Sequence, residues 1–311
     1  MTATTPSPSS ASEMQIRPAS LWRLTWRRLL RQRSAQVGGL ILLLLVLTAI
    51  FAPVIAPYDP LEVLIGKEDV RKREAPCIHL LGCPPDKPQH IMGIDGNFRD
   101  VFSRVIYGTR VSLFVGFTTV TFAIIAGTLL GAISGYAGGW VDNVIMRLMD
   151  VLMAFPSLLL AIAIVAVLGR GLQNALLAIA IVSTPVYARV VRASVLSLKE
   201  REFVQASRAL GAGHAHILLR RILPNALPPL IVQATLGVAT AILDAAALSF
   251  LGLGAQPPTP EWGTMLGTER NQVFTAPHLV FFPGLAIMIT VLAFNLLGDG
   301  LRDALDPRLK Q

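Results

Sequence analysis

The chain has 311 residues, of which 53% are hydrophobic and 15% are charged, and its formal net charge is +8. A soluble domain carries about 25% charged residues, so this composition excludes an ordinary soluble enzyme or binding module. Apolar runs of about 20 residues, long enough to cross a bilayer as a helix, recur along the chain. The basic residues lie in loops beside these runs, as the positive-inside rule expects, and they form no separate nucleic-acid-binding domain. The apolar runs are continuous rather than alternating, so we expect an all-α polytopic membrane protein.

The first 36 residues are predicted to be a cytoplasmic tail. Residues 1–20 are rich in Ser, Thr, Pro and Ala, a composition typical of disorder. Trp22–Arg33 is basic and amphipathic, which suits the membrane interface. The first transmembrane helix is placed at 37–57, around the apolar run Val37–Ile55. This run is longer than the ~7–15 residues of a signal-peptide core, so we expect an uncleaved helix whose N-terminus is cytoplasmic.

Residues 58–104 are predicted to form an extracytoplasmic loop. Its Cys77 and Cys83 are spaced to close a small disulfide in an oxidising compartment, and two unpaired thiols are the alternative. A structural zinc site needs about four ligands, so we expect no metal here. The segment Asp95–Tyr107 has apolar residues at helical spacing, which predicts an amphipathic helix along the membrane surface.

Residues 105–300 are predicted to be a core of five further transmembrane helices, followed by a cytoplasmic tail at 301–311. Six spans in total place both termini on one side of the membrane. With the N-terminus inside, the basic region 189–221 and the C-terminal tail are also inside, although basic residues between 67 and 110 disagree with the rule. The five core spans are expected at Val111–Ile133, Val144–Leu168, Leu172–Val195, Leu227–Phe250 and Leu279–Leu297.

A polar, basic loop at 199–224 separates two of these spans. Glu202 to Leu210 is predicted to be a short helix, and Gly211 can end it by adopting a positive φ. Pro224 lies where the next span is expected to begin, and an ordinary connecting loop is the alternative interpretation. His214 and His216 lack acidic or Cys partners nearby, so we expect them to be solvated rather than metal-bound. The expected helix places four residues on one face: Phe203, Ala206, Ser207 and Leu210.

Charged residues also occur within or beside the spans. Asp244 falls inside the fifth span and is a candidate to line a translocation path, with a polar contact to a partner subunit as the alternative. Arg147 and Asp150 are expected to pair with each other or with the loop. Arg189 and Arg192 are expected to be positive-inside anchors at the inner end of the fourth span.

Several stretches resemble one family. Glu202–Pro229 resembles the cytoplasmic "EAA" loop of binding-protein-dependent ABC importer permeases. Four further stretches are similar to the permeases for dipeptides, oligopeptides, nickel and glutathione: Gly93–Leu113, Met146–Ile162, Leu248–Gly263 and Phe282–Arg308. Within that family the chain is similar to the second, C-type, subunit.

Some positions depart from the family pattern. Gln205-Ala206-Ser207 stands where the family has Glu-Ala-Ala, so a negative charge is missing from the loop helix. Ala245 stands where Glu is common, and Ile94 and Phe98 replace the usual Thr and Gly of the motif before the second span. The lost charge weakens any carry-over of an ion pair to the ATPase, while the docking shape is kept.

The resemblance implies a type I ABC importer permease fold in a cell inner membrane. It implies a heterodimer with a B-type permease, two ATP-binding subunits and an extracytoplasmic solute-binding protein, with lipid around the spans. ATP and Mg are expected on the ATPase subunits, and this chain is expected to bind no cofactor, since it has no G-x-x-x-x-G-K-[ST] phosphate loop. Contacts to the ATPase are expected from Phe203, Gln205, Ala206, Ser207, Arg208, Leu210, Gly211, His214, Ile217, Leu223 and Pro224.

Two other classes of function remain open at this point. A secondary transporter driven by an ion gradient would transport without any ATPase, and a membrane scaffold would not transport at all. The substrate also stays open among dipeptides, oligopeptides, glutathione and nickel complexes.

Overall fold

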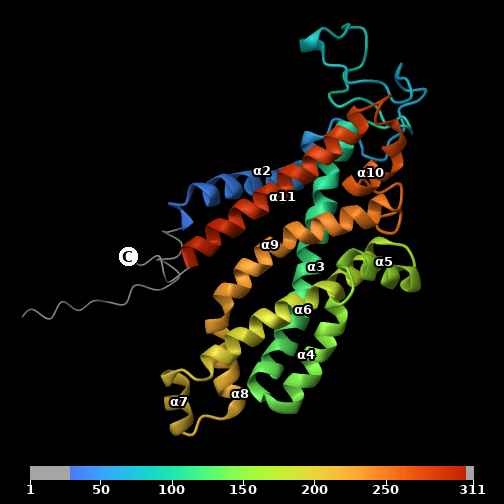
Figure 1. Ribbon diagram of the computed structural model, residues 1–311. Helices are drawn as coiled ribbons and strands as arrows, with labels where there is room; N and C mark the ends of the chain where they lie inside the picture. Colours follow the sequence, from blue (N-terminus) through green and yellow to red (C-terminus); the bar gives the residue numbers. More distant parts are fainter. Residues whose placement is uncertain (1–28, 306–311) are drawn as a thin grey trace, which may run out of the picture.

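The computed structural model describes residues 29–305, so residues 1–28 and 306–311 of the predicted tails 1–36 and 301–311 lie outside the described residues. Within that range the chain is mainly helical (Figure 1). A π-helical turn, Ile217–Ile222, joins α8 to α9. The α-helices are α2 (Arg33–Ile55), α3 (Val101–Ala137), α4 (Gly139–Met153), α5 (Ser157–Leu168), α6 (Leu172–Leu198), α7 (Glu202–Ala209), α8 (His214–His216), α9 (Leu223–Phe250), α10 (Trp262–Glu269) and α11 (His278–Leu305).

Five helices in the described range are long and apolar enough to cross a membrane: α2, α3, α6, the unit His214–Phe250 and α11. The pair α4 and α5 meets the same test only when taken together, and it is bent by 92°. Counting this bent pair as one span brings the total within the described residues to the expected six. The span predicted over Val144–Leu168 is broken into two helices, because Pro156 has extended backbone at the break and has no N–H for a helical hydrogen bond.

The amphipathic surface helix predicted over Asp95–Tyr107 is also wrong. Residues 95–100 form a turn, in which Phe98 has a φ of 59°. Asp100 then caps α3, since its Oδ2 accepts a hydrogen bond from Ser103 N at 2.7 Å. No residue breaks the helix after this cap, so the apolar positions that suggested a separate helix are the first turns of a 37-residue span.

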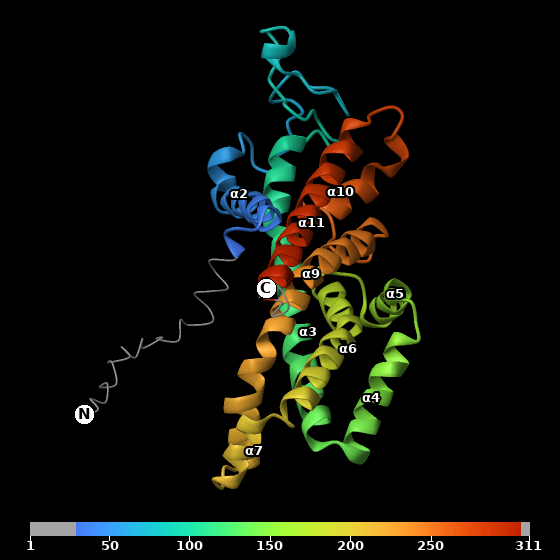
Figure 2. The same ribbon diagram turned by 60° about the vertical axis from the view of Figure 1, so that its left-hand side comes forward.

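The helices α3 and α6 pack side by side and form the centre of the bundle (Figure 2). Small residues on α3 allow this close approach. A Cβ on Gly127 would lie 2.6 Å from Tyr187 Cβ, and one on Gly131 would overlap the carbonyl group of Ala188. Since lipid gives helices no hydrophobic reason to associate, such backbone proximity is a main source of attraction between spans.

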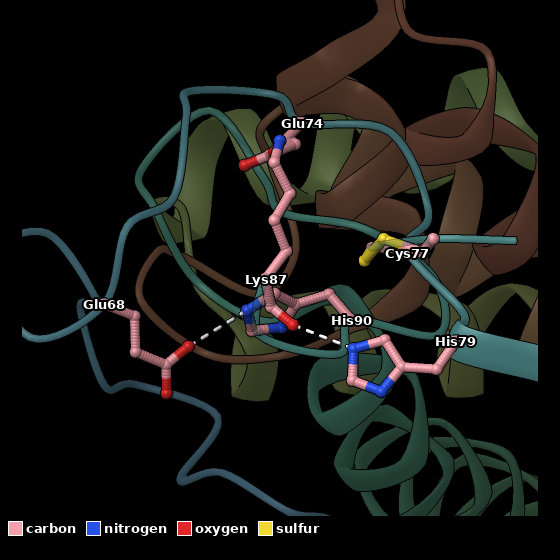
Figure 3. Close-up of a disulfide and its surroundings, with 7 residues drawn as sticks. Glu68, Glu74, Cys77, His79, Lys87 and His90 are labelled. Carbon is pink, nitrogen blue, oxygen red and sulfur yellow. Dashed lines mark hydrogen bonds and ion pairs between the residues drawn. A yellow bond between two sulfur atoms is a disulfide. The ribbon is translucent and has the colours of Figure 1, made fainter. Parts of the chain in front are cut away.

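The disulfide loop, residues 58–100, lies at one end of the molecule, and α7 and α8 lie at the opposite end (Figure 1). Cys77 and Cys83 are joined, with their Cα atoms 5.4 Å apart, so the paired alternative is the one that the structure contains (Figure 3). Lys87 contacts two residues of the same loop, one through its side chain and one through its carbonyl. Its Nζ lies 3.1 Å from Glu74 Oε1, and its carbonyl accepts a hydrogen bond from His79 Nε2 at 2.8 Å.

His90 is buried at the base of this loop, with 3% of its surface exposed. Its Nδ1 lies 2.9 Å from Asp100 Oδ1 and its Nε2 lies 3.1 Å from Glu68 Oε2, while Tyr58 stacks against the ring. Burial by itself lowers the pKa of His90, but the hydrogen bonds and charges of Asp100 and Glu68 outweigh it and raise the pKa above its usual value. Through these two contacts His90 ties the start of α3 to the loop.

The close packing of α3 against α6 predicts that adding one methyl group at Gly131 lowers the stability of the protein. Gly131→Ala should destabilise the purified protein by about 1–3 kcal/mol, because the new Cβ overlaps the backbone of Ala188. Thermal unfolding in detergent measures this as a lower midpoint. Gly39→Ala is the matched control, since a Cβ at that helical position meets no atom within 4 Å. Equal midpoints for the two variants would contradict the close-packing account.

The His90 cluster predicts a pH dependence of stability. A group whose pKa is raised in the folded state contributes stability that is fully present below its unfolded value of about 6.5 and is lost as the pH rises through the folded pKa. The difference in thermal midpoint between the natural protein and His90→Gln should therefore be largest near pH 6 and should shrink in alkaline buffer. A difference that grows with pH would contradict a raised pKa of His90 in the folded protein.

Candidate functional site

The helix α7 forms at Glu202–Ala209, as the sequence predicts. Glu202 lies in its first turn and Arg208 in its last, where each charge favours the helix dipole. One residue of α7 is buried, Val204, which is fully enclosed and belongs to the same apolar cluster as Ile217 and Ile222. Sequence reasoning missed this anchor, although Val204 is the one β-branched residue of α7. Its burial fixes α7 to the start of the next span.

The predicted face of α7 is open to the surroundings. Phe203 is 40% exposed and Leu210 is 88% exposed, and Ala206 between them is also exposed. Ser207 turns its hydroxyl inward, where it donates to Phe203 O at 2.8 Å. Gln205 donates its side-chain amide to Glu200 O at 3.1 Å, so this departure from the family's Glu is used within the loop. The result is an apolar surface on a short, anchored helix.

Gly211 ends α7 with a φ of 81°. The amide of Gly211 donates to Arg208 O at 3.0 Å and that of Ala212 donates to Ser207 O at 3.1 Å. This pair of hydrogen bonds is the Schellman arrangement, which requires a left-handed residue and favours glycine. The chain therefore reverses over only a few residues, 210–213, before the next helix starts.

The predicted loop 199–224 is too long at its C-terminal end. Leu223 and Pro224 are not in a loop, because His214–Phe250 is continuous helical structure with buried Ile217 in its first turns. The π-helical turn before them widens the backbone where Pro224 has no N–H to donate. His214 was expected to be only solvated; it is exposed, and its Nδ1 lies 2.8 Å from the Tyr136 hydroxyl. His216 is exposed.

Ion pairs between α4 and α6 brace the same end of the molecule. Arg192 holds Asp142 through two hydrogen bonds of 2.6 Å, and Ser134 of α3 donates to the same carboxylate. Arg189 Nη2 lies 2.6 Å from Asp150 Oδ1. The expected pairing of Asp150 with Arg147 or the loop is therefore wrong. These partners are about 40–50 residues apart in the chain, so local spacing gave no signal of them.

A third group of residues joins the disulfide loop to α10. Arg73 Nε lies 2.8 Å from Glu269 Oε2, and the amide of Gly96 donates to Glu269 Oε1 at 3.0 Å. Trp262, at the start of α10, donates its indole N–H to Val105 O of α3 at 3.0 Å. Glu261 caps α10 through the amides of Gly263 and Thr264. Two stretches that carry the sequence resemblance, Gly93–Leu113 and Leu248–Gly263, thus meet at one end of the molecule.

Asp244 lies in α9 and is half-buried, near the end of the helix that is remote from α7. The site residues predicted in the loop and Asp244 are therefore not gathered into one cluster. The loop residues lie at one end of the molecule, and Asp244 lies within the apolar unit His214–Phe250, which is long enough to cross a membrane.

Family models match two parts of the chain. Residues 127–311 match the family described as "Binding-protein-dependent transport system inner membrane component". Residues 20–76 match the "N-terminal TM domain of oligopeptide transport permease C". Both the bundle and the region around the first helix are covered by these matches.

Relatives with a described role match almost the full length. The "Dipeptide transport system permease protein DppC" of Alkalihalophilus pseudofirmus is 50% identical over 307 residues, covering 98% of this chain and 96% of the relative. The "Glutathione transport system permease protein GsiD" of Escherichia coli is 49% identical, covering 93% and 91%. The "Di/tripeptide transport system permease protein DppC" of Pseudomonas aeruginosa is 49% identical, covering 92% and 91%.

A solved structure shares the fold. A permease chain of the MetNI methionine ABC transporter in an inward-facing conformation matches with a TM-score of 0.54 and 21% identity, covering 65% of this chain and 96% of that one. This similarity concerns the fold alone and supports the expected type I importer architecture. From the family matches and the full-length relatives, the chain belongs to the inner-membrane components of binding-protein-dependent transport systems, the permease subunits of ABC importers.

Proposed function

We propose that this chain is one of two different permease subunits in an ABC importer for short peptides, and that it forms half of the translocation path. The relatives are named as permeases for dipeptides, for di- and tripeptides, and for glutathione, which is itself a tripeptide. The match of residues 20–76 to an oligopeptide permease C domain supports the C-type role, with a B-type permease as the partner.

The exposed apolar face of α7 is the observation that carries the coupling proposal. Phe203, Ala206 and Leu210 offer a surface that a groove of an ATP-binding subunit can hold, with one such subunit for each permease. ATP and Mg bind to those subunits. When the two ATP-binding subunits close on each other, α7 moves with them. The buried contact of Val204 then transmits this movement to the helix that begins at His214. Nucleotide thereby shifts the population between inward-open and outward-open states.

The proposed orientation places α7 and both termini in the cytoplasm of a cell with an inner membrane. Disulfides persist in oxidising compartments outside the cytosol. The Cys77–Cys83 bond therefore supports an extracytoplasmic position for the disulfide loop, and α7 lies at the opposite end of the molecule (Figure 1). The disulfide loop and α10 then face the compartment in which a solute-binding protein delivers the peptide.

A charge on the open face of α7 should break the contact to the ATPase. Leu210→Glu is expected to lower the amount of ATP-binding subunit that co-purifies with the permeases at least several-fold, because docking would bury an unpaired carboxylate. The matched control is Leu80→Glu, which changes a leucine that is 93% exposed in the disulfide loop. Normal co-purification of Leu210→Glu, or equal loss in both variants, would contradict the proposed docking surface.

The turn after α7 should set the efficiency of coupling. Gly211→Val places a β-branched residue at a φ of 81°, a conformation that it adopts only with strain, and so changes the direction in which the chain leaves α7. We expect ATP hydrolysis to continue while peptide uptake into proteoliposomes falls. Gly213→Ala is the control, since Gly213 has a negative φ and open space around it. Unchanged uptake per ATP in Gly211→Val would argue against the lever.

A further inference from the structure

The outward faces of the spans differ in chemistry. On α2 the exposed large side chains in the middle of the helix are apolar, and α3 carries a similar exposed apolar face. Such surfaces suit contact with lipid tails, which offer no hydrogen-bonding partner. The residues concerned are Leu40, Leu43, Leu44, Leu47, Ile50 and Phe51 on α2, and Phe114, Phe122, Ile125, Leu129 and Ile133 on α3.

The helix α9 has a different outward face. Its Asn225, Gln233, Thr240 and Asp244 fall within about 100° of one another at 3.6 residues per turn. Asn225 and Thr240 are exposed, and Gln233 and Asp244 are half-buried. The buried side chains of Val238 and Ile242 point the opposite way into the bundle, and Leu243, which is 46% exposed, lies in the same arc as the four polar residues. We call these four residues the polar stripe.

The polar stripe is as long as a membrane is thick. From Asn225 to Asp244 the helix rises about 28 Å, close to the ~30 Å of the hydrocarbon core. A single contact with a neighbouring helix would need one polar residue, whereas the polar stripe places polar side chains at several depths, as the lining of an aqueous path requires. Polar groups within spans face the bundle interior or a water-filled cavity, because exposure to lipid is costly.

The backbone adds polarity at the α7 end of the stripe. Pro228 and Pro229 have no N–H, so the carbonyls of Pro224 and Asn225 lack their usual helical donors. A hollow of about 690 Å³ opens beside this part of α9, and Asn225, Gln233 and Arg302 of α11 are among its lining residues. Water in this hollow can donate to carbonyls that lack those helical donors.

Asp244 supplies the one carboxylate of the stripe. Within residues 29–305 no hydrogen bond or ion pair engages it. We propose that the polar stripe lines the aqueous translocation path and that Asp244 receives the amino-terminal ammonium group of the peptide in transit. This inference rests on the proposed peptide importer, because an ammonium group at one end is what short peptides have in common. The step is reversible binding and involves no covalent change.

Cysteine labelling can test the stripe in the assembled transporter. The chain's two cysteines are joined, so an introduced cysteine is its only free thiol. Thr240→Cys, one turn from Asp244, should react readily with small charged thiosulfonates added in water. Phe114→Cys should react slowly, since Phe114 is 58% exposed on the apolar face. It lies at a similar depth, because the neighbouring Gly116 contacts Val238 and Ile242 of α9.

The sign of the reagent's charge tests the role of Asp244. One carboxylate about 6 Å away in water should make a cationic reagent react with Thr240→Cys roughly tenfold faster than an anionic one of equal size. When Asp244→Asn is combined with Thr240→Cys, the two reagents should react at about equal rates. When Asp244→Glu is combined with Thr240→Cys, the preference for the cationic reagent should remain. Labelling of Thr240→Cys no faster than that of Phe114→Cys would overturn the aqueous lining. Fast labelling with no charge preference, as when a cation of the second permease neutralises Asp244, would overturn the ammonium site.

Peptide uptake by the same proteoliposomes separates this inference from the proposed function. Asp244→Asn should reduce uptake of a dipeptide with a free amino terminus, and Asp244→Glu should retain more of it. If the natural complex takes up no peptide while the tenfold preference persists, the peptide importer fails and the cation-selective lining stands. If peptide uptake is normal and Asp244→Asn leaves it unchanged, the importer stands and the ammonium site fails.

Discussion

The enclosed contact of Val204 with the apolar cluster at Ile217 and Ile222 is the interaction on which the functional account depends. Without it α7 would be an isolated segment of eight residues, too short to be a stable helix in water. Burial of these three side chains makes α7 and the start of the next span one mechanical unit. A force applied to the exposed face of α7 is therefore transmitted to a helix that crosses the membrane.

The two ends of the molecule are built by different physical means. At the α7 end, the bidentate Arg192–Asp142 pair and the apolar cluster hold short helices against the spans. At the other end, a disulfide, buried His90 and the Arg73–Glu269 pair hold irregular chain on α3 and α10. The first arrangement suits transmission of movement, and the second suits a fixed surface on which a delivering protein can dock.

Local chemistry made part of this structure predictable. The short helix after Glu202, its end at Gly211 and the long apolar spans depend on spacing, glycine and hydropathy within a few residues. The break at Pro156 was missed because the apolar run continues through it. Hydrophobic composition does not show where the axis of a helix changes direction. The uninterrupted α3 was missed because α10 and α11 bury one side of its first turns. These turns therefore have apolar residues on one face only, which is also the sequence pattern of a helix lying on a membrane surface. The pairing of Arg192 with Asp142 depends on the fold, which brings together residues 50 positions apart.

The most direct test of the coupling claim is a cross-link from the middle of α7. Ala206→Cys places the chain's only free thiol on the exposed face, since the two natural cysteines are joined. In intact cells, a short bifunctional thiol reagent that crosses membranes should link this residue to the ATP-binding subunit, with a yield that changes when ATP is trapped. Modification of Ala206→Cys from outside intact cells by a reagent that cannot cross the membrane would contradict the account.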